Sequence, residues 1–214
     1  MKRPLKRSYN STLRREAGER TRQSILDSAR RMFLEKGYAA TTMPGIARAA
    51  GVALDTVYAT AGRKPALLRM LVELAIAGGD KAVAAEDRDY VRAIRAEPDA
   101  ARKLRLYATA LAPIHSRLAP LIRVLQEAAP LDPELDAMWR EIAQRRAGNM
   151  RLLAENLAAA GRLQTSLSVS KAADIIWSMN SPEFYLLLVD QRGWSPQEYA
   201  QWLGDTWVKI LLEP

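Results

Sequence analysis

Apolar residues recur at every third or fourth position along most of the chain, and this spacing constrains the fold more than any other feature. After residue 20 no stretch alternates apolar and polar residues over the length of a strand, so the pattern is that of helices. Signals for helix ends at Gly51, Asp132-Pro133, Gly161 and Ser181-Pro182 divide it into roughly ten helices. The sequence therefore predicts an all-α protein.

Several helix ends can be placed from capping residues. Thr42 precedes a proline by two residues, which predicts an N-cap with proline in the first turn of a short helix that ends at Gly51. Gly37 is placed to end the preceding helix in a left-handed cap. Ser195 and Glu198 have the spacing of a capping box, so a terminal helix is expected from about residue 196 to residue 212.

Charge is distributed unevenly along the chain. The formal net charge is +8, yet residues 1–70 hold 15 Lys and Arg against 5 Asp and Glu, whereas residues 71–214 hold 17 against 19. This break favours a small basic domain followed by a larger, nearly neutral one. We expect a basic flexible arm at residues 1–15, a three-helix domain at 16–64 and a larger helical domain at 65–214.

The composition excludes several kinds of site. No cysteine is present, which removes disulfides, thiolate metal ligands and a cysteine nucleophile. His115 is the only histidine, and it has no carboxylate or second imidazole at ligand spacing. No glycine loop that binds phosphate occurs either. The sequence therefore predicts no metal, no cofactor and no enzymatic activity. It has neither a signal-peptide pattern nor a membrane-spanning apolar run, so we expect a cytoplasmic protein without membrane contact.

The segment from Ile46 to Tyr58 has the spacing of a helix-turn-helix. Ala47 is small where two helices must cross closely, Gly51 lies where the turn needs a positive φ, and Val57 follows six residues later to fill the core. The alternative is an ordinary pair of Ala-rich helices in a protein core. The basic surroundings favour DNA binding, because positive charge beside this motif neutralises phosphates.

Four motifs extend this pattern over nearly fifty residues: TRQSILDSARRMFLEKGY at 21–38, TTMPGIA at 41–47, GVALDTVY at 51–58 and KPALL at 64–68. Together they resemble the DNA-binding domain of the tetracycline-repressor (TetR) family. Two positions depart from the family pattern. Ala61 replaces a usual aromatic residue, and Ala53 replaces a frequent serine that caps the recognition helix and typically contributes about 1 kcal/mol.

The resemblance implies a recognition helix over residues 54–60 in the major groove, with phosphate contacts from Thr42, Tyr58 and Lys64. Arg48 and Arg63 are further candidates, because cations bind phosphate whatever the base sequence.

The recognition helix lacks the Arg, Lys, Asn and Gln that read guanine or adenine through paired hydrogen bonds. Leu54 can contact a thymine methyl group, Thr56 a base edge or phosphate, and Asp55 a cytosine amino group. Asp55 can equally serve as an acidic residue near the positive helix end. We therefore expect the arm to add affinity through phosphates or a narrow minor groove. Its cationic residues are Lys2, Arg3, Lys6, Arg7, Arg14 and Arg15.

Half of the aromatic residues, seven of fourteen, lie between Trp177 and Trp207. Large aromatics are enriched in interface cores, and the resemblance implies a homodimer formed through a four-helix bundle. The expected interface residues are Phe184, Tyr185, Trp202 and Trp207. The alternative is that these rings fill the core of a single chain.

Residues that mix apolar and polar groups recur between Tyr90 and Asn180, as they do in binding cavities. Plain core packing is the alternative for each of them, and Asn180 needs a partner if it is buried. The candidate effector pocket comprises Tyr107, His115, Met138, Trp139, Met150, Trp177, Met179 and Asn180.

These expectations describe a transcriptional repressor that binds a palindromic operator as a dimer and is released by a small-molecule effector. Its partners would be double-stranded DNA, the effector and a second copy of the chain. The alternative is an architectural or partner-dependent DNA-binding regulator with no effector, whose second domain is simply packed core.

Overall fold

A computed structural model describes residues 6–78, 84, 87–160 and 162–213, with side chains from Leu13 onward. Within these residues it contains helices and no strand, apart from one isolated antiparallel bridge between Leu163 and Leu212. The all-α prediction is confirmed. No helix in the described ranges is long and apolar enough to cross a membrane.

The helices are α1 (Lys6–Ala40), α2 (Met43–Ala50), α3 (Leu54–Ala61), α4 (Lys64–Ala77), α5 (Asp89–Ala96), α6 (Ala100–Ala128), α7 (Pro133–Ala159), α8 (Val169–Met179), α9 (Pro182–Tyr185) and α10 (Pro196–Leu211), with a 3-10 turn η2 (Ala129–Leu131) and a π-helical turn η3 (Leu186–Gln191). They form two compact units, residues 1–71 and 72–214. The boundary lies seven residues beyond the predicted end of the first domain. The reason is that the first half of α4, with the fully buried Leu67 and Leu68, belongs to the N-terminal unit.

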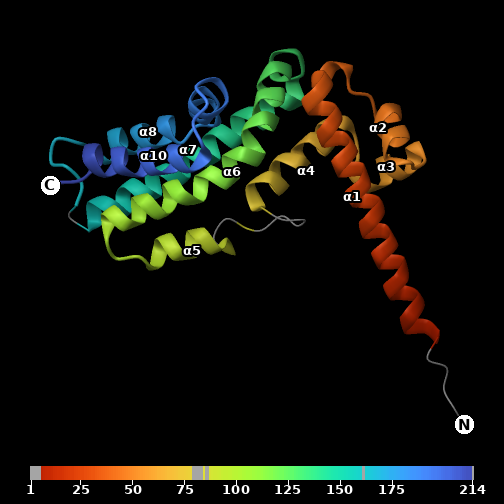
Figure 1. Ribbon diagram of the computed structural model, residues 1–214, viewed down its shortest axis with the longest axis horizontal. Helices are drawn as coiled ribbons and strands as arrows, with labels where there is room; N and C mark the ends of the chain where they lie inside the picture. The colour runs from red at the N-terminus through yellow and green to blue at the C-terminus, as the bar shows by residue number, and fades with distance from the viewer. Residues whose placement is uncertain (1–5, 79–83, 85–86, 161, 214) are drawn as a thin grey trace, which may run out of the picture. The chain divides into compact units, whose positions relative to one another are not determined.

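In the N-terminal unit, α2 and α3 pack beside the C-terminal half of α1 (Figure 1). Ile25 and Phe33 of α1, Ile46 of α2 and Val57 of α3 are completely buried and form the centre of this unit. The Ser24 hydroxyl donates to the carbonyl of Ala50 at 3.0 Å and ties α1 to the end of α2. The predicted helix-turn-helix is therefore present as two short helices packed on a third.

The turn between α2 and α3 has the predicted geometry. Gly51 has φ 70° and ψ 31°, the left-handed conformation in which an L side chain is disfavoured. Thr42 caps α2, because its Oγ1 accepts a hydrogen bond from the amide of Gly45 at 3.2 Å. α2 therefore begins and ends where the sequence predicts.

Gly37 interrupts α1 at a kink, so a helix end lies where the sequence predicts it, but the geometry is not that of a left-handed cap. Its φ of 74° is positive, whereas its ψ of 174° lies far from the left-handed helical value. The Thr41 hydroxyl donates to the carbonyl of Gly37 at 2.8 Å. The carbonyl of Gly37 thus has a hydrogen-bond partner although the kink interrupts the helix.

The flexible arm predicted over residues 1–15 is helical from Lys6 onward, as the first part of α1. Lys2 and Arg3 lie outside the described residues. No proline or glycine interrupts residues 6–17, and Glu16 precedes Arg20 by four residues, a spacing that supports a helix. Residues 13–20 are all exposed, so this stretch gains its helical form without a core beneath it.

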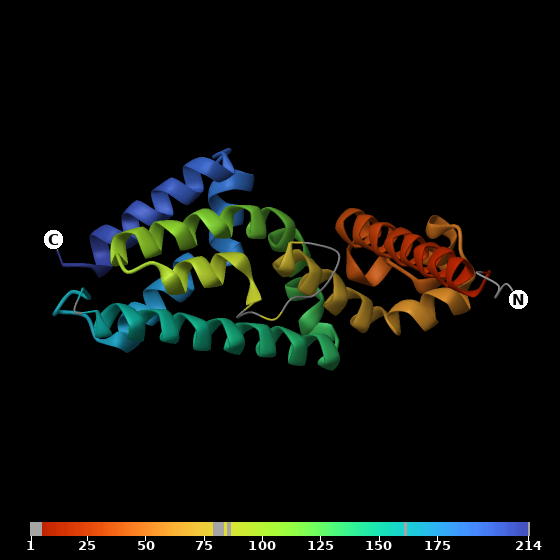
Figure 2. The same ribbon diagram turned by 90° about the horizontal axis from the view of Figure 1, so that it is seen from below.

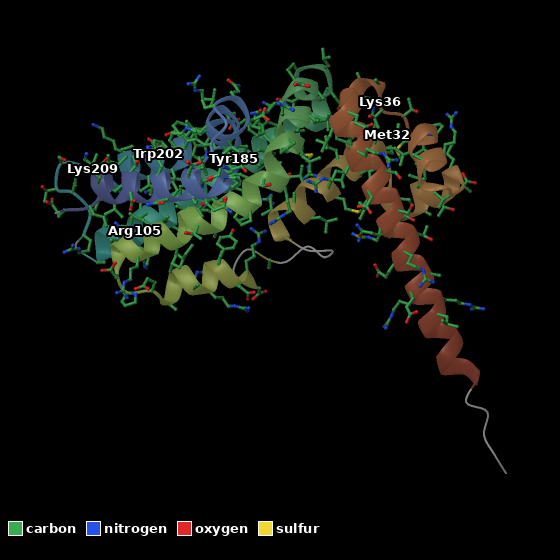
Figure 3. The ribbon with its side chains drawn as sticks, viewed as in Figure 1. Met32, Lys36, Arg105, Tyr185, Trp202 and Lys209 are labelled. Carbon is green, nitrogen blue, oxygen red and sulfur yellow. The ribbon has the colours of Figure 1, made fainter. Side chains whose placement is uncertain are left out.

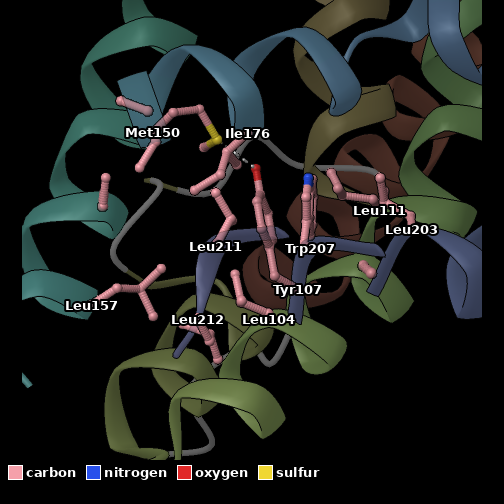
Figure 4. Packing of buried hydrophobic residues seen from close by; sticks show 14 of the residues in the cluster. Leu104, Tyr107, Leu111, Met150, Leu157, Ile176, Leu203, Trp207, Leu211 and Leu212 are labelled. Atoms are coloured by element: carbon pink, nitrogen blue, oxygen red, sulfur yellow. Dashed lines mark hydrogen bonds between the residues drawn. The ribbon is translucent and has the colours of Figure 1, made fainter. Parts of the chain in front are cut away.

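In the second unit, α6 runs alongside α10 and α5, and α7 packs against α6 and α8 (Figure 2). The buried core contains the completely buried Leu104, Leu203 and Trp207 (Figure 4). α10 begins after a capping box, in which Ser195 and Glu198 bond reciprocally, and it ends one residue before the predicted end. The helix end predicted at Gly161 lies outside the described residues.

Replacing Gly37 with alanine is expected to lower the free energy of unfolding of the N-terminal unit by about 1–3 kcal/mol. A Cβ at Gly37 would meet nothing within 4 Å among the described atoms, so the cost is backbone strain at φ 74° alone. Gly18→Ala in the same helix is the control, because Gly18 is exposed and helical with open space around it. We expect it to stabilise by about 0.5–1 kcal/mol. Urea unfolding followed by circular dichroism measures both, and equal effects would contradict the assigned conformation of Gly37.

Candidate functional site

The outer face of the helix-turn-helix carries most of the predicted DNA contacts. Thr42, Arg48, Leu54, Asp55, Tyr58 and Arg63 are exposed, whereas Thr56 and Lys64 are half-buried. Leu54 and Tyr58 are four residues apart, so they share one face of α3, whereas Val57 of the same helix is completely buried. An exposed leucine and tyrosine on a helix of only eight residues are available to a partner.

The N-terminus of α3 has the weak cap that the sequence predicts. Ala53 occupies the N-cap with no side-chain hydrogen bond, and Asp55 is the only acidic residue of the first turn. Both roles proposed for Asp55 remain compatible with this position. At α2, the cap uses a lone pair of the Thr42 oxygen, so the hydroxyl hydrogen can still be donated to an anion.

The ammonium of Lys64 is engaged within the N-terminal unit. Nζ donates to the carbonyl of Tyr38 at 2.9 Å and to that of Thr41 at 3.0 Å. It also lies 4.0 Å from the centre of the Tyr38 ring. The phosphate contact predicted for this side chain therefore competes with internal bonds.

The second unit brings together a buried polar cluster, which we define as Tyr107, His115, Arg146, Met150, Asn180 and Tyr199. The amide of Asn180 donates to the Tyr107 oxygen at 2.6 Å and to the Met150 sulfur at 3.1 Å. The Tyr107 hydroxyl lies 3.5 Å from the same sulfur (Figure 4). Burial raises the pKa of Tyr107 and of Tyr199, so both phenols are neutral at physiological pH. The cluster thus joins α6, α7, the C-terminal end of α8 and α10 through neutral side chains and the cationic Arg146.

His115 lies inside this cluster with its ring against two tyrosines. The ring centres of Tyr185 and Tyr199 are 5.6 and 6.4 Å away. Neither Nδ1 nor Nε2 has a hydrogen-bond partner by geometry among the described residues, although the side chain is 98% buried. Burial, and then the positive charge of Arg146, lower the pKa of His115 to about 3, against the opposing effect of the Asn180 side chain. His115 is therefore neutral and unsuited to general acid-base work near pH 7.

Arg146 and Tyr199 were not predicted as site residues. Arg146 donates to the carbonyls of Trp177 and Asn180 at 2.8 and 3.0 Å, and its guanidinium lies 5.1 Å from the Trp177 ring centre. Tyr199 donates to the carbonyl of Met179 at 3.3 Å. Helical spacing could have indicated Arg146, because it lies four residues before Met150 and four after Ile142, both of which are buried.

The other four predicted pocket residues are not members of the cluster. Trp177 and Met179 contact it, Trp177 through its ring and its carbonyl and Met179 through its carbonyl. Trp139 lines a surface hollow with Gln126, Leu131 and Asp136, apart from the polar cluster. Met138 is buried in the early part of α7. A second hollow lies along α5 and α6, where Tyr90 and Arg117 line it. Neither of these two hollows is lined by a residue of the cluster.

The predicted interface residues divide into two groups. Trp207 is fully buried and Tyr185 is 95% buried within their own chain, so neither ring is exposed for a contact with a second copy. Phe184 and Trp202 are half-buried and stacked at 5.8 Å, and Trp194 meets Trp202 edge-on at 5.7 Å. Trp202 borders a surface hollow on α10 with Asp205 and Lys209, and Figure 3 labels Trp202 and Lys209 on this helix.

The neutral, buried His115 makes the stability of the second unit depend on pH. The unfolded histidine titrates near 6.5 and the folded one near 3, so below pH 6.5 the unfolded state binds a proton that the folded state does not. The contribution of the neutral His115 to the free energy of unfolding is thus fully present above pH 6.5 and is lost as the pH falls below it. Between pH 7 and pH 5, wild type should lose about 2 kcal/mol more than His115→Phe, measured by urea unfolding. Identical losses in the two proteins would contradict a neutral buried imidazole.

Comparison with known proteins supports the assignment of the N-terminal unit. Residues 25–71 match the family of bacterial regulatory proteins described as the tetR family. No curated protein shows a significant sequence match to the chain.

Solved structures resemble the whole fold. NalD from Pseudomonas aeruginosa, the secondary repressor of the MexAB-OprM multidrug efflux pump, is 22% identical with a TM-score of 0.71, over 92% of this chain and 98% of NalD. PfmR from Thermus thermophilus, a TetR-family regulator, is 22% identical with a TM-score of 0.63, over 88% and 99%. A protein from Saccharomonospora viridis described as a transcriptional regulator, solved with choline, is 18% identical with a TM-score of 0.66, over 90% and 98%.

The helix-turn-helix with its exposed outer face, the match over residues 25–71 and the likeness of the helical body lead to one assignment. The N-terminal unit of this chain belongs to the tetR family of bacterial regulatory proteins, and the chain as a whole has the fold of TetR-family regulators.

Proposed function

We propose that this protein is a transcriptional repressor that binds a palindromic operator as a homodimer and is released from it by a small molecule. The observation that carries the proposal is the outer face of the helix-turn-helix and the turns that flank it. This face presents Thr42, Arg48, Tyr58 and Arg63 to solvent within residues 1–70, which hold 15 Lys and Arg against 5 Asp and Glu. Such a face supplies the phosphate contacts that hold a short recognition helix in the major groove.

The half-buried aromatic residues of the second unit support self-association. Phe184 stacks on Trp202, Trp194 meets Trp202 edge-on, and all three remain partly open to solvent. A two-fold axis through such a surface would present two recognition helices to half-sites about one turn of DNA apart. We assign this surface, rather than the buried Trp207 and Tyr185, to the dimer contact.

The buried polar cluster is our candidate for the effector site. Trp207 Nε1 and both ring nitrogens of His115 are buried, and none of them reaches hydrogen-bond geometry with the described residues, although the Asn180 side chain lies close enough to act on the pKa of His115. Buried polar atoms without well-formed hydrogen bonds call for an explanation such as a bound molecule. The structure with choline shows a small molecule bound to a protein of this fold. Binding would shift the dimer toward an arrangement whose half-site separation no longer fits successive grooves, and a coupling of about 1–3 kcal/mol is enough for regulation.

One observation favours the second candidate function, a DNA-binding regulator without a small effector. Tyr107, Asn180 and Met150 already bond to one another, as the members of a packed core do. The two functions differ in one outcome. An effector dissociates the protein from DNA, whereas an architectural regulator keeps its DNA affinity whatever metabolite is added.

Deleting residues 1–13 is expected to weaken DNA binding and to flatten its dependence on salt. The deletion removes Lys2, Arg3, Lys6 and Arg7, and the slope of log K against log salt falls by about 0.9 for each phosphate that these cations neutralise. Fluorescence anisotropy with a labelled duplex between about 50 and 200 mM salt measures both quantities. Unchanged affinity and slope would remove any role for the start of α1.

Two measurements on the purified full chain test the proposal. Affinity for a short duplex of random sequence should fall steeply between about 50 and 200 mM salt, and light scattering should give the mass of a dimer. The bound complex is then exposed to a metabolite library. Release by one compound supports the repressor, and release by none supports the second candidate. Failure to bind duplex DNA at about 50 mM salt would contradict both.

A further inference from the structure

The ammonium of Lys64 lies at the C-terminal end of α1. Two of its three N–H donors are directed at backbone carbonyls, those of Tyr38 at 2.9 Å and Thr41 at 3.0 Å. The same nitrogen lies 4.0 Å from the centre of the Tyr38 ring. Carbonyls at a helix C-terminus carry partial negative charge, and an aromatic face attracts a cation, so this place stabilises an ammonium group in two ways.

One of the two carbonyls, that of Tyr38, belongs to the last turn of α1, and the other, that of Thr41, belongs to the connection between α1 and α2. Thr41 is completely buried and its hydroxyl bonds to Gly37, while the Tyr38 ring stacks on the buried Phe33 at 5.7 Å. The next residue, Thr42, is the N-cap of α2. Lys64 is the first residue of α4, so it ties the start of α4 to the segment that decides where α2 begins.

The position of α3 follows from that of α2. The turn between them is short and closed by a hydrogen bond from the amide of Val52 to the carbonyl of Ala47 at 3.0 Å, with Gly51 in the left-handed conformation. A displacement at Thr41 therefore moves α2 and α3 together. A shift of about 1 Å in a recognition helix is enough to lose the geometry that base contacts need.

We propose that Lys64 is a positioning residue for DNA recognition: it holds α2 and α3 in the orientation that fits the operator, and its ammonium does not contact phosphate. The proposal rests on the DNA-binding function proposed above. The two roles predict different effects on DNA affinity. A phosphate contact adds affinity for every DNA sequence, whereas a positioning residue adds affinity for the specific site.

The test compares Lys64→Gln with wild type on two duplexes, a sequence selected from random DNA by the wild type and a scrambled sequence of equal length. We expect Lys64→Gln to lose about 10-fold or more on the selected duplex and less than about 3-fold on the scrambled one, with an unchanged salt slope. Arg63→Gln, at the exposed neighbouring position, is the matched control, and it should weaken binding to both duplexes alike. Lys64→Arg, which keeps a cation at the helix end, should restore most of the specific affinity.

Two results would overturn the proposal. Equal losses on both duplexes, with a slope reduced by about 0.9 per contact, would identify Lys64 as a phosphate contact. Unchanged affinity of the folded variant for both duplexes would leave Lys64 with a role in stability only.

A readout without DNA separates this proposal from the proposed function. If the wild type selects no DNA sequence, the proposed function is rejected. The rate of amide exchange of Gly45 and Ile46 at the start of α2 then tests whether Lys64 positions this helix. Faster exchange in Lys64→Gln supports the positioning of α2, and unchanged exchange contradicts it.

Discussion

Replacing Tyr58 with glutamate is expected to lower the affinity for duplex DNA by about 100-fold or more. Tyr58 is 44% exposed on the outer face of α3, where its hydroxyl is a candidate donor to phosphate. Glutamate removes that donor and puts a negative charge near the phosphates, and like charges brought together cost several kcal/mol. Since each ~1.4 kcal/mol changes affinity tenfold, a loss of two powers of ten follows. Anisotropy with a labelled duplex at low salt measures it.

Gln144→Glu is the matched control for charge, because Gln144 is exposed on α7 in the second unit and the substitution changes the net charge equally. We expect its affinity to stay within about 2-fold of wild type, because Gln144 is not among the predicted DNA contacts and salt screens exposed charges. Tyr58→Phe isolates the hydroxyl and should cost about 10-fold. Equal losses for Tyr58→Glu and Gln144→Glu would show that only net charge matters and that α3 is not the DNA-binding element.

Replacing Trp207 with alanine is expected to lower the free energy of unfolding of the second unit by about 3–5 kcal/mol. The indole is fully buried and stacks on Tyr107 at 5.6 Å, among Leu104, Leu111 and Leu203 (Figure 4). Its removal leaves a cavity that a close-packed helical core fills only in part. Urea unfolding monitored by circular dichroism gives the change.

Trp202→Ala is the matched comparison on the same helix. Trp202 is half-buried and stacks on Phe184 at 5.8 Å. We expect a smaller loss of stability, of about 1 kcal/mol, together with a shift from dimer to monomer in light scattering. A Trp202→Ala protein that remains a dimer at every concentration would exclude this aromatic surface as the dimer contact.

The sequence was sufficient to predict the elements of the fold, because their ends depend on local chemistry. The caps at Thr42, Gly51 and Ser195 act within a few residues of themselves, and each forms as expected. Gly37 behaves differently. Its positive φ is a local requirement, but its ψ is set by how the end of α1 meets Thr41, which the sequence pattern does not show.

The direction in which a side chain faces was harder to predict than the helix that carries it. Trp202 and Trp207 are five positions apart, which places them roughly 140° apart around a helix, so they could not both belong to one narrow interface. Phe184 and Tyr185 directly precede the π-helical turn of Leu186–Gln191, whose hydrogen-bond spacing departs from that of an α-helix.

The two candidate sites also differ in how far local sequence patterns predict them. Exposure of the DNA-binding face follows from the helix-turn-helix pattern, so Leu54, Asp55 and Tyr58 lie where the sequence predicts. The polar cluster depends on contacts between residues far apart in the sequence, such as Tyr107 with Asn180. Helical spacing indicates that Arg146 faces inward, but its bonds to the carbonyls of Trp177 and Asn180 join residues more than thirty positions apart, which no motif encodes.

The most direct test of the proposed function is selection of bound sequences from a pool of random duplex DNA with the purified full chain. A dimer that presents two recognition helices should enrich a palindrome whose half-sites lie about one turn of DNA apart. Tyr58→Glu, carried through the same selection, should enrich nothing. Failure of the wild type to enrich any palindrome, or equal enrichment by Tyr58→Glu, would contradict the assignment of α3 as the recognition helix of a dimeric repressor.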